Sequence, residues 1–239
     1  MIKFERVSKK LGDVQALDHL DLEIPRGQLL AIVGLSGSGK STAVNVMAGL
    51  LPIDSGRYLF DGEDVSKARK NNATAIGLRR RTGYISQASD MMANFSASEN
   101  IKIAGWCRGI TVDDDTVRDV LEAVELDGFE DRAPQSISGG QRQRVNIARG
   151  LACKPQAIFA DEPTGALDIH TGQIVIDNLI DVSKSRGITL ILVTHSPEYA
   201  ALCERQIVLH HGRIAYDEST SDFKDIKRRI DDCAKDVPR

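Results

Sequence analysis

The sequence predicts an α/β fold with a mainly parallel sheet and a helical insertion. Three observations predict it. A glycine-rich loop stands between an apolar strand and a helix near residue 34. The last third of the chain alternates strands with helices, which is typical of a parallel sheet covered on both faces. The middle, from about residue 87 to 149, carries mainly helical signals.

The first third reads as strands separated by Gly and Pro. Residues 20–24 alternate apolar and acidic side chains, the pattern of a half-buried strand. Pro25-Arg26-Gly27 turns the chain, and Leu29 to Val33 forms a buried strand. Apolar residues then recur at helical spacing from 43 to 51, where Pro52 ends the helix. Further strands are expected around Tyr58 and Phe60 and from Thr82 to Ser86.

In the middle of the chain, Val117 begins an apolar series at positions i, i+3, i+4 and i+7. The aspartates at 113–115 precede it, where carboxylates cap a helix; they lack the glycine and distal Glu of a calcium loop. The last third predicts a strand at 157–160, a helix from about 172 to 184 and a strand at 189–194. The tail from Asp217 is expected to be a solvated helix or a loose end.

Composition narrows the class of protein. The chain has 239 residues, 41% hydrophobic and 27% charged, with a formal net charge of -3, so it does not resemble a basic nucleic-acid binder. Its four cysteines lie far apart, which argues against a zinc site or a disulfide framework. No apolar run reaches the ~20 residues of a membrane helix, and the start lacks a secretory signal. We expect a soluble, intracellular, globular protein.

A nucleotide phosphate loop is the strongest motif. Gly34-Leu35-Ser36-Gly37-Ser38-Gly39-Lys40-Ser41 matches G-x-x-x-x-G-K-[ST], directly after a buried strand and at the start of a helix that continues through Thr42. Glycines let backbone amides converge on phosphate oxygens, and the helix adds its positive end. Lys40 is expected to reach the β- and γ-phosphates, and Ser41 to bind Mg²⁺.

A phosphate loop also needs a second strand that carries acids. The strand at 157–160 leads into Asp161 and Glu162. Asp161 is placed to hold Mg²⁺, and Glu162 is placed to polarise a water aimed at the γ-phosphate. A strand that ends in two acids before a proline is common in proteins of many kinds. We assign these acids to metal binding and water activation because the chain also carries a phosphate loop.

Between these motifs, Ile137-Ser138-Gly139-Gly140-Gln141-Arg142-Gln143-Arg144 resembles the signature of ATP-binding cassette (ABC) ATPases. The other motifs of that family follow in order: Gln87 after its strand, Asp168 in Gly165-Ala166-Leu167-Asp168, and His195 after Val193-Thr194. The resemblance runs from Ile2 to about Asp217. It implies a phosphate-loop NTPase with an N-terminal antiparallel β subdomain. The cassette would span 1–217, with a RecA-like core at about 1–86 and 155–217, a helical subdomain at about 87–154, and a tail at 218–239.

The resemblance also implies roles. Two cassettes pack head to tail, so Ser138, Gly139, Gly140 and Gln141 would meet the γ-phosphate bound by the other subunit. Gln87 would sense metal and water, and Asp168 would couple the two sites across the dimer. His195 would contact the γ-phosphate and hold Glu162 in line. The cofactors implied are ATP and Mg²⁺.

Gly165, where many importers carry Ser, is similar to the branch that serves macrolide export, lipoprotein release and antimicrobial-peptide resistance. That branch implies a second ATPase cassette, in a homodimer, and an integral membrane permease that docks around residues 87–106. The chain would lie peripherally on the cytoplasmic face of the membrane and touch the membrane only through the permease.

Some features depart from the family or lie outside it. Leu11 occupies the usual adenine-stacking position, which removes π-stacking from base binding. Residues 65–82 carry six cations and no acid, predicting a solvated face or, alternatively, a contact with acidic lipid headgroups or a membrane partner: Lys67, Arg69, Lys70, Arg79, Arg80 and Arg81. His210-His211 reads as a strand turn rather than a metal site. Trp106 is expected in the core of the helical insertion.

Three functions stay open on the sequence. A transport motor predicts a separate membrane partner. A cytosolic cassette protein usually has two cassettes or a long coiled coil, and neither is present here. A phosphate-loop kinase or a non-hydrolysing module would need an acceptor site, whereas Glu162 and His195 point to water. An importer remains the alternative within the first class.

Overall fold

The computed structural model describes residues 1–69, 72–88, 91–219 and 222–235. It divides into two units: Met1–Leu78 with Thr189–Arg239, and Arg79–Ile188. The expected division into a core, a helical subdomain and a tail from 218 stays a prediction.

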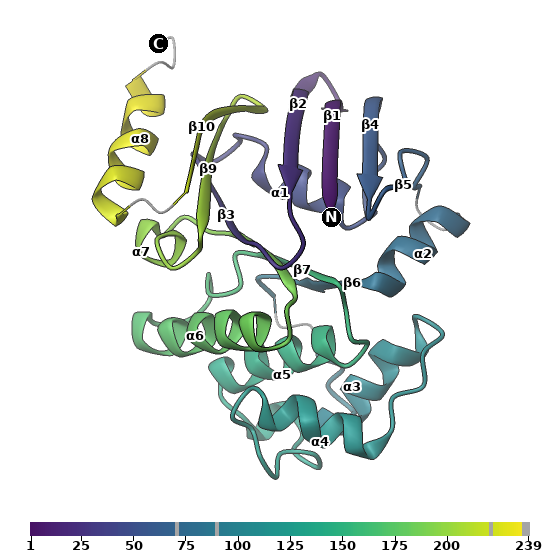
Figure 1. Ribbon diagram of the computed structural model, residues 1–239. Helices are drawn as coiled ribbons and strands as arrows, with labels where there is room; N and C mark the ends of the chain where they lie inside the picture. The colour runs from purple at the N-terminus through teal and green to yellow at the C-terminus, as the bar shows by residue number, and fades with distance from the viewer. Residues whose placement is uncertain (70–71, 89–90, 220–221, 236–239) are drawn as a thin grey trace. The chain divides into compact units, whose positions relative to one another are not determined.

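Two sheets build the first unit (Figure 1). One is antiparallel, with strand order β2-β1-β4-β5. In the other, β3 lies between β8 and β9 and runs parallel to both, while β10 pairs antiparallel with β9. The unit contains β1 (Ile2–Leu11), β2 (Val14–Ile24), β3 (Leu29–Val33), α1 (Lys40–Met47), β4 (Ser55–Phe60), β5 (Glu63–Asp64), β8 (Thr189–Val193), α7 (Pro197–Ala200), β9 (Arg205–His210), β10 (Arg213–Ser219) and α8 (Phe223–Lys235).

The central strand β3 positions the phosphate loop. All five of its residues are buried, because it has a parallel neighbour on each side and an apolar sequence. Gly34 follows directly, so the loop starts at the carboxyl end of a central parallel strand, where α/β proteins place their ligands. Tyr58 donates a hydrogen bond to the carbonyl of Met47 (2.7 Å), which ties the antiparallel sheet to the end of α1.

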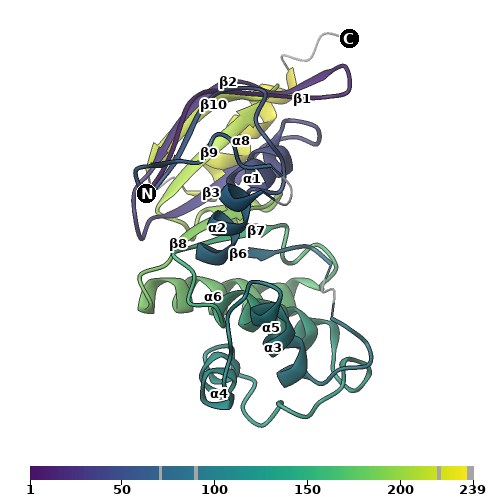
Figure 2. The ribbon, with the colours of Figure 1, turned by 90° about the vertical axis from the view of Figure 1, so that its right-hand side faces the viewer.

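The second unit is mainly helical. It contains β6 (Thr82–Ile85), α3 (Ala97–Trp106), α4 (Asp114–Glu122), a 3₁₀ turn (Pro134–Ser136), α5 (Gly139–Leu151), β7 (Ala157–Asp161) and α6 (Ile169–Ser185), and α2 (Ala73–Arg81) crosses into it from the first unit. Strands β6 and β7 are parallel, and α5 packs against β6, α3, α4 and α6. Within this unit α5 and α6 lie next to the strand pair, with α4 farther away (Figure 2).

The predicted fold class is confirmed: a parallel sheet, an N-terminal antiparallel sheet and a helical insertion are all present. One placement was wrong. Trp106 is 79% exposed instead of buried in the insertion, because it is the last residue of α3 and the chain turns away after it. The tail is a helix, α8, and it buries Ile226 and Cys233. Among the basic residues at 65–82, Lys70 lies outside the described residues.

Candidate nucleotide-binding site

The phosphate loop in the first unit has the shape of an anion cradle. Gly34 and Gly39 have φ values of 146° and 104°, which side-chain-bearing residues rarely adopt. A Cβ would lie 2.3 Å from the carbonyl oxygen of Leu209 at Gly34, and 2.3 Å from that of Ala16 at Gly39. Only glycine fits at these two positions. This is a physical reason for the glycine spacing found in the sequence.

The loop ends at α1, and no side chain of the described residues caps the N-terminus of this helix. The positive end of the helix dipole lies there, and it favours an anion. Lys40 Nζ donates to the carbonyl oxygens of Gly34 and Leu35, both at 2.9 Å, so the ammonium group is held over the loop. Ser38 Oγ is buried and has no hydrogen-bond partner among the described residues. These features fit a bound phosphate group.

The remaining loop residues lie as the motif requires. Ser36 and Gly37 are exposed at the turn, whereas Thr42 is buried in the first turn of α1. Ser41 is exposed on the same turn. His195, also in the first unit, is exposed two residues beyond β8, in a turn where the Ser196 amide donates to Thr194 Oγ1 (3.0 Å).

The phosphate loop is also supported by a hydrogen bond from a distant segment, which local sequence patterns do not predict. The amide of Gly212 donates to the carbonyl of Ser38 (2.9 Å), and the carbonyl of Gly212 accepts from Asp18 (3.0 Å). Gly212 belongs to the two-residue turn between β9 and β10. The turn therefore supports the loop from a segment more than 170 residues further along the chain, a separation that local patterns cannot bridge.

The acidic pair lies in the second unit. Asp161 is the last residue of β7, and Tyr84 Oη lies 3.5 Å from Asp161 Oδ2. Burial, together with the charge of Asp161, raises the pKa of Tyr84 to about 12. Glu162 follows with φ 51°, a conformation that costs energy for a residue other than glycine. Backbone strain of this kind clusters at functional sites, and no local pattern around Glu162 indicates it.

The second unit brings Gln87 close to the segment after Glu162. Gln87 follows β6 and is exposed. A Cβ at Gly165 would lie 2.5 Å from Gln87 Nε2, so the amide group of Gln87 occupies the space that a side chain at 165 would need.

The signature segment opens α5, as expected. Ser138 is the N-cap: its hydroxyl accepts from the Gln141 amide (3.2 Å), and the Gln141 side chain accepts from the Ser138 amide (2.8 Å). This reciprocal capping box fixes the helix start. A Cβ at Gly140 would lie 2.1 Å from Thr171 Cγ2, so glycine lets α5 approach α6 closely.

Asp168 begins α6 in the same way. Its carboxylate accepts from the Thr171 amide (3.0 Å), which holds the pKa of Asp168 below its usual value. Leu167 lies against Gly139, where a Cβ would be 3.5 Å from the leucine side chain. The second unit thus places Gln87 and the signature segment beside the chain segment 162–168, which ends at Asp168. The phosphate loop and His195 belong to the first unit.

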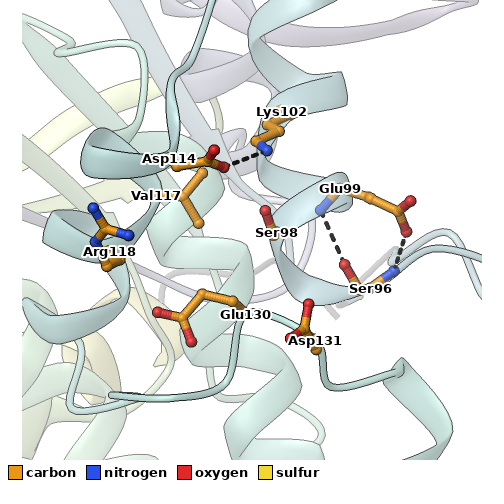
Figure 3. A pocket seen from close by; sticks show the side chains of 9 residues that line it. All are labelled: Ser96, Ser98, Glu99, Lys102, Asp114, Val117, Arg118, Glu130 and Asp131. Carbon is orange, nitrogen blue, oxygen red and sulfur yellow. Dashed lines mark hydrogen bonds and ion pairs between the residues drawn. The ribbon is translucent and has the colours of Figure 1, made fainter.

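A separate hollow of about 590 Å³ lies beside the start of α3 (Figure 3). Lys102 pairs with Asp114 across it (2.6 Å), and Ser96 and Glu99 form the capping box of α3 at its rim. Glu130 and Asp131 add two carboxylates. None of the predicted site residues lines this hollow.

This fold and this loop define a phosphate-loop NTPase. The protein-family model described as ABC transporter matches residues 17–165. The chain therefore belongs to the ABC transporter family and is an ATPase cassette of that family, whose members bind ATP with Mg²⁺. No helix in the described part of the chain combines the length and apolarity that crossing a bilayer requires.

Proteins similar to this chain over most of its length are ATP-binding proteins of transport systems. The lipoprotein-releasing system ATP-binding protein LolD of Shewanella oneidensis is 37% identical over 228 residues, covering 92% of this chain and 97% of its own. The methionine import ATP-binding protein MetN of Geobacillus kaustophilus is 36% identical over a stretch that covers 90% of this chain and 64% of MetN. The macrolide export ATP-binding/permease protein MacB of Campylobacter fetus is 35% identical over a stretch that covers 96% of this chain and 37% of MacB. This chain thus spans less than two thirds of MetN and MacB.

Among solved structures, a dimeric post-hydrolysis state of the cassette MJ0796, bound to ADP and Pi, matches with a TM-score of 0.81 and 31% identity. The match covers 92% of this chain and 99% of that chain.

Proposed function

We propose that this chain forms an ATP-dependent dimer whose hydrolysis cycle drives a separate membrane subunit of an exporter or mechanotransmission complex. The phosphate loop carries the proposal: Lys40 is held over a glycine cradle, and the buried Ser38 hydroxyl has no partner among the described residues. The dimeric state of the MJ0796 cassette supports the pairing of two copies.

In this proposal each site residue has a stated task. Bound Mg²⁺ neutralises phosphate charge, and Ser41 and Asp161 would hold it. Lys40 and the amides of residues 34–42 bind the phosphates. Glu162 accepts a proton from the attacking water, while His195 keeps that carboxylate in line and Gln87 orients the water. Ser138 and the amides of Gly139, Gly140 and Gln141 reach the γ-phosphate of the other copy, and Asp168 couples the two sites.

The branch of the family is inferred from LolD, which this chain matches over nearly the full length of both proteins. MacB carries its permease in the same chain, as its name states, and the similarity covers 37% of it. An importer is the second candidate, because MetN is 36% identical. In either case we infer a position on the cytoplasmic face of the membrane.

The permease is proposed to dock around residues 87–106. The hollow beside α3 lies at this segment, and Glu130 and Asp131 give it carboxylates for a basic side chain of the partner. Docking there would move α3, and α3 follows Gln87 in the chain, so the partner could act on the residue that orients the water.

The test is a pull-down with Glu162→Gln, which removes the proton acceptor and keeps the size of the side chain. We expect this variant to bind ATP, to lose turnover and to accumulate as a dimer that retains its partner from detergent-solubilised membranes. A captured protein with few spans and a large extracytoplasmic domain supports the exporter or mechanotransmission branch. A compact permease with many spans indicates an importer. Near wild-type hydrolysis by the variant removes Glu162 as the proton acceptor.

A further inference from the structure

The end of α3 exposes an aromatic side chain. Trp106 is the last residue of that helix and is 79% exposed. Cys107 and Gly109 in the following turn are exposed as well. Single exposed apolar residues are common on protein surfaces, so this indole becomes informative only through the side chains around it.

Two arginines are held beside this turn. Arg80, near the end of α2, donates from Nε to the carbonyl of Arg108 (2.7 Å). Arg108 in turn donates to the carbonyl of Thr82 (3.0 Å). The Arg80 guanidinium also lies against Gly109, where a Cβ would be 2.8 Å from its Nη2. We call Arg79, Arg80, Trp106 and Arg108 the α2–α3 corner.

The positive charge of this corner is not offset by carboxylates. Carbonyl oxygens orient the Arg80 and Arg108 guanidiniums and leave their charge unneutralised. Within residues 1–69, 72–88, 91–219 and 222–235, no carboxylate forms an ion pair with Arg79, Arg80 or Arg108.

The acids that follow the corner in sequence are engaged elsewhere. Asp113 caps α4 through the Thr116 amide (2.8 Å), Asp114 pairs with Lys102, and Asp115 pairs with Arg118. Two fixed guanidinium groups, those of Arg80 and Arg108, therefore lie at the turn that follows the exposed indole, and within the described residues no carboxylate pairs with either.

We propose that the α2–α3 corner contacts an anionic lipid surface. Guanidinium groups pair with phosphate oxygens, and basic clusters near a membrane are attracted to anionic lipids. Tryptophan favours the depth of the headgroups, because its indole is largely apolar and carries one N–H donor. With 79% of its surface exposed, the Trp106 side chain is accessible to such headgroups. The chain would make this contact itself, contrary to the expectation that it touches the membrane only through the permease, and Trp106 is the last residue of the segment proposed to dock that partner.

The chain provides its own reporter, since Trp106 is its only tryptophan. We would mix the full-length protein with phosphatidylcholine vesicles, neutral or with about one third phosphatidylglycerol, and record tryptophan emission. We expect a blue shift, and quenching by brominated acyl chains, only with the anionic vesicles and only at low salt.

Charge variants distinguish binding through this corner from nonspecific attraction of the protein's cations to anionic vesicles. Arg79→Gln is expected to lower the partition coefficient roughly fivefold, the share of one cation near an anionic surface. Lys227→Gln is the matched control: it removes one exposed cation from α8 and is expected to leave binding nearly unchanged. Vesicle co-sedimentation of Trp106→Ala is expected to show weaker binding as well.

Three results would overturn the proposal. The first is no blue shift with anionic vesicles. The second is an equal shift with neutral vesicles, and the third is an equal loss in Arg79→Gln and Lys227→Gln. A shift that requires the purified membrane subunit in detergent, with none on vesicles, would assign the corner to a protein partner instead. The proposed ATPase function is untouched by these outcomes, because its test measures turnover and dimerisation.

Discussion

The turn between β9 and β10 is predicted to support the phosphate loop, and Gly212→Ala tests this. Gly212 has φ 74°, and a Cβ there would lie 2.7 Å from the carbonyl oxygen of Ala16. Gly62 offers a matched control, because it occupies the same place in the two-residue turn between β4 and β5, with φ 82° and no atom of the described residues within 4 Å of a Cβ. Both substitutions therefore share the backbone strain, and only Gly212→Ala adds a clash.

The expected losses of unfolding free energy follow from the backbone strain and the clash. The left-handed backbone costs alanine about 1–2 kcal/mol, which is the full expected loss of unfolding free energy for Gly62→Ala. The clash adds about 1–3 kcal/mol at Gly212, because the opposing atoms are backbone and cannot rotate away. The variant must also move the amide that donates to Ser38. We therefore expect ATP to bind more weakly to Gly212→Ala, and as tightly to Gly62→Ala as to the wild type.

Urea unfolding measures the first quantity, and titration with a fluorescent ATP analogue and Mg²⁺ measures the second, at a temperature where both variants are folded. The reasoning is refuted if the two variants lose equal stability and bind the nucleotide equally well. Loss of stability at Gly212 with unchanged nucleotide binding would leave a structural turn that does not support the loop.

Two further predictions concern pH and the shared sites. The Ser66 hydroxyl and amide, with Arg57, lower the pKa of Asp64 to about 2, so this carboxylate stabilises the fold above pH ~4 and loses that effect as the pH falls toward 2. Asp64→Asn should lower stability slightly at pH 7 and match the wild type near pH 2 in urea unfolding, and a constant difference across that range would contradict it. A mixture of Ser138→Arg and Lys40→Ala subunits should keep one competent composite site, measured as ATP turnover above that of either variant alone. Full activity of pure Ser138→Arg would exclude the signature acting in trans.

Local patterns predicted much of this molecule. The buried strand Leu29–Val33, the helix after the phosphate loop and the start of a helix at the signature segment all follow from contiguous residues, and the structure has each of them. Boundaries that depend on pairing were less accurate. β2 starts at Val14, whereas the alternation in the sequence predicts a strand only over residues 20–24, because irregular pairing with β1 breaks the period-2 pattern.

Contacts between distant segments could not be predicted. The sequence predicts Trp106 in a core, because an aromatic residue in a helical segment usually packs, and no local pattern indicates that the chain turns away after it. The hydrogen bond from Gly212 to Ser38 and the contact of Gln87 with Gly165 join segments whose adjacency only the fold creates. The strained φ of Glu162 likewise depends on the turn in which it is held.

The capping geometry of Ser138 bears on its proposed role. A hydroxyl has two acceptor lone pairs and one donor hydrogen, and the cap uses it only as an acceptor from the Gln141 amide. Its own hydrogen remains for a phosphate oxygen of the other subunit. The helix start therefore need not lose its cap when a nucleotide arrives, and the hydroxyl is already oriented by the bond that it accepts. Ser138→Ala removes both contributions, so it should lose about 1 kcal/mol of stability and additionally slow ATP turnover. Ser138→Thr retains the hydroxyl and should restore most of both, and a threonine variant as defective in turnover as alanine would show that the hydroxyl does not act on the phosphate.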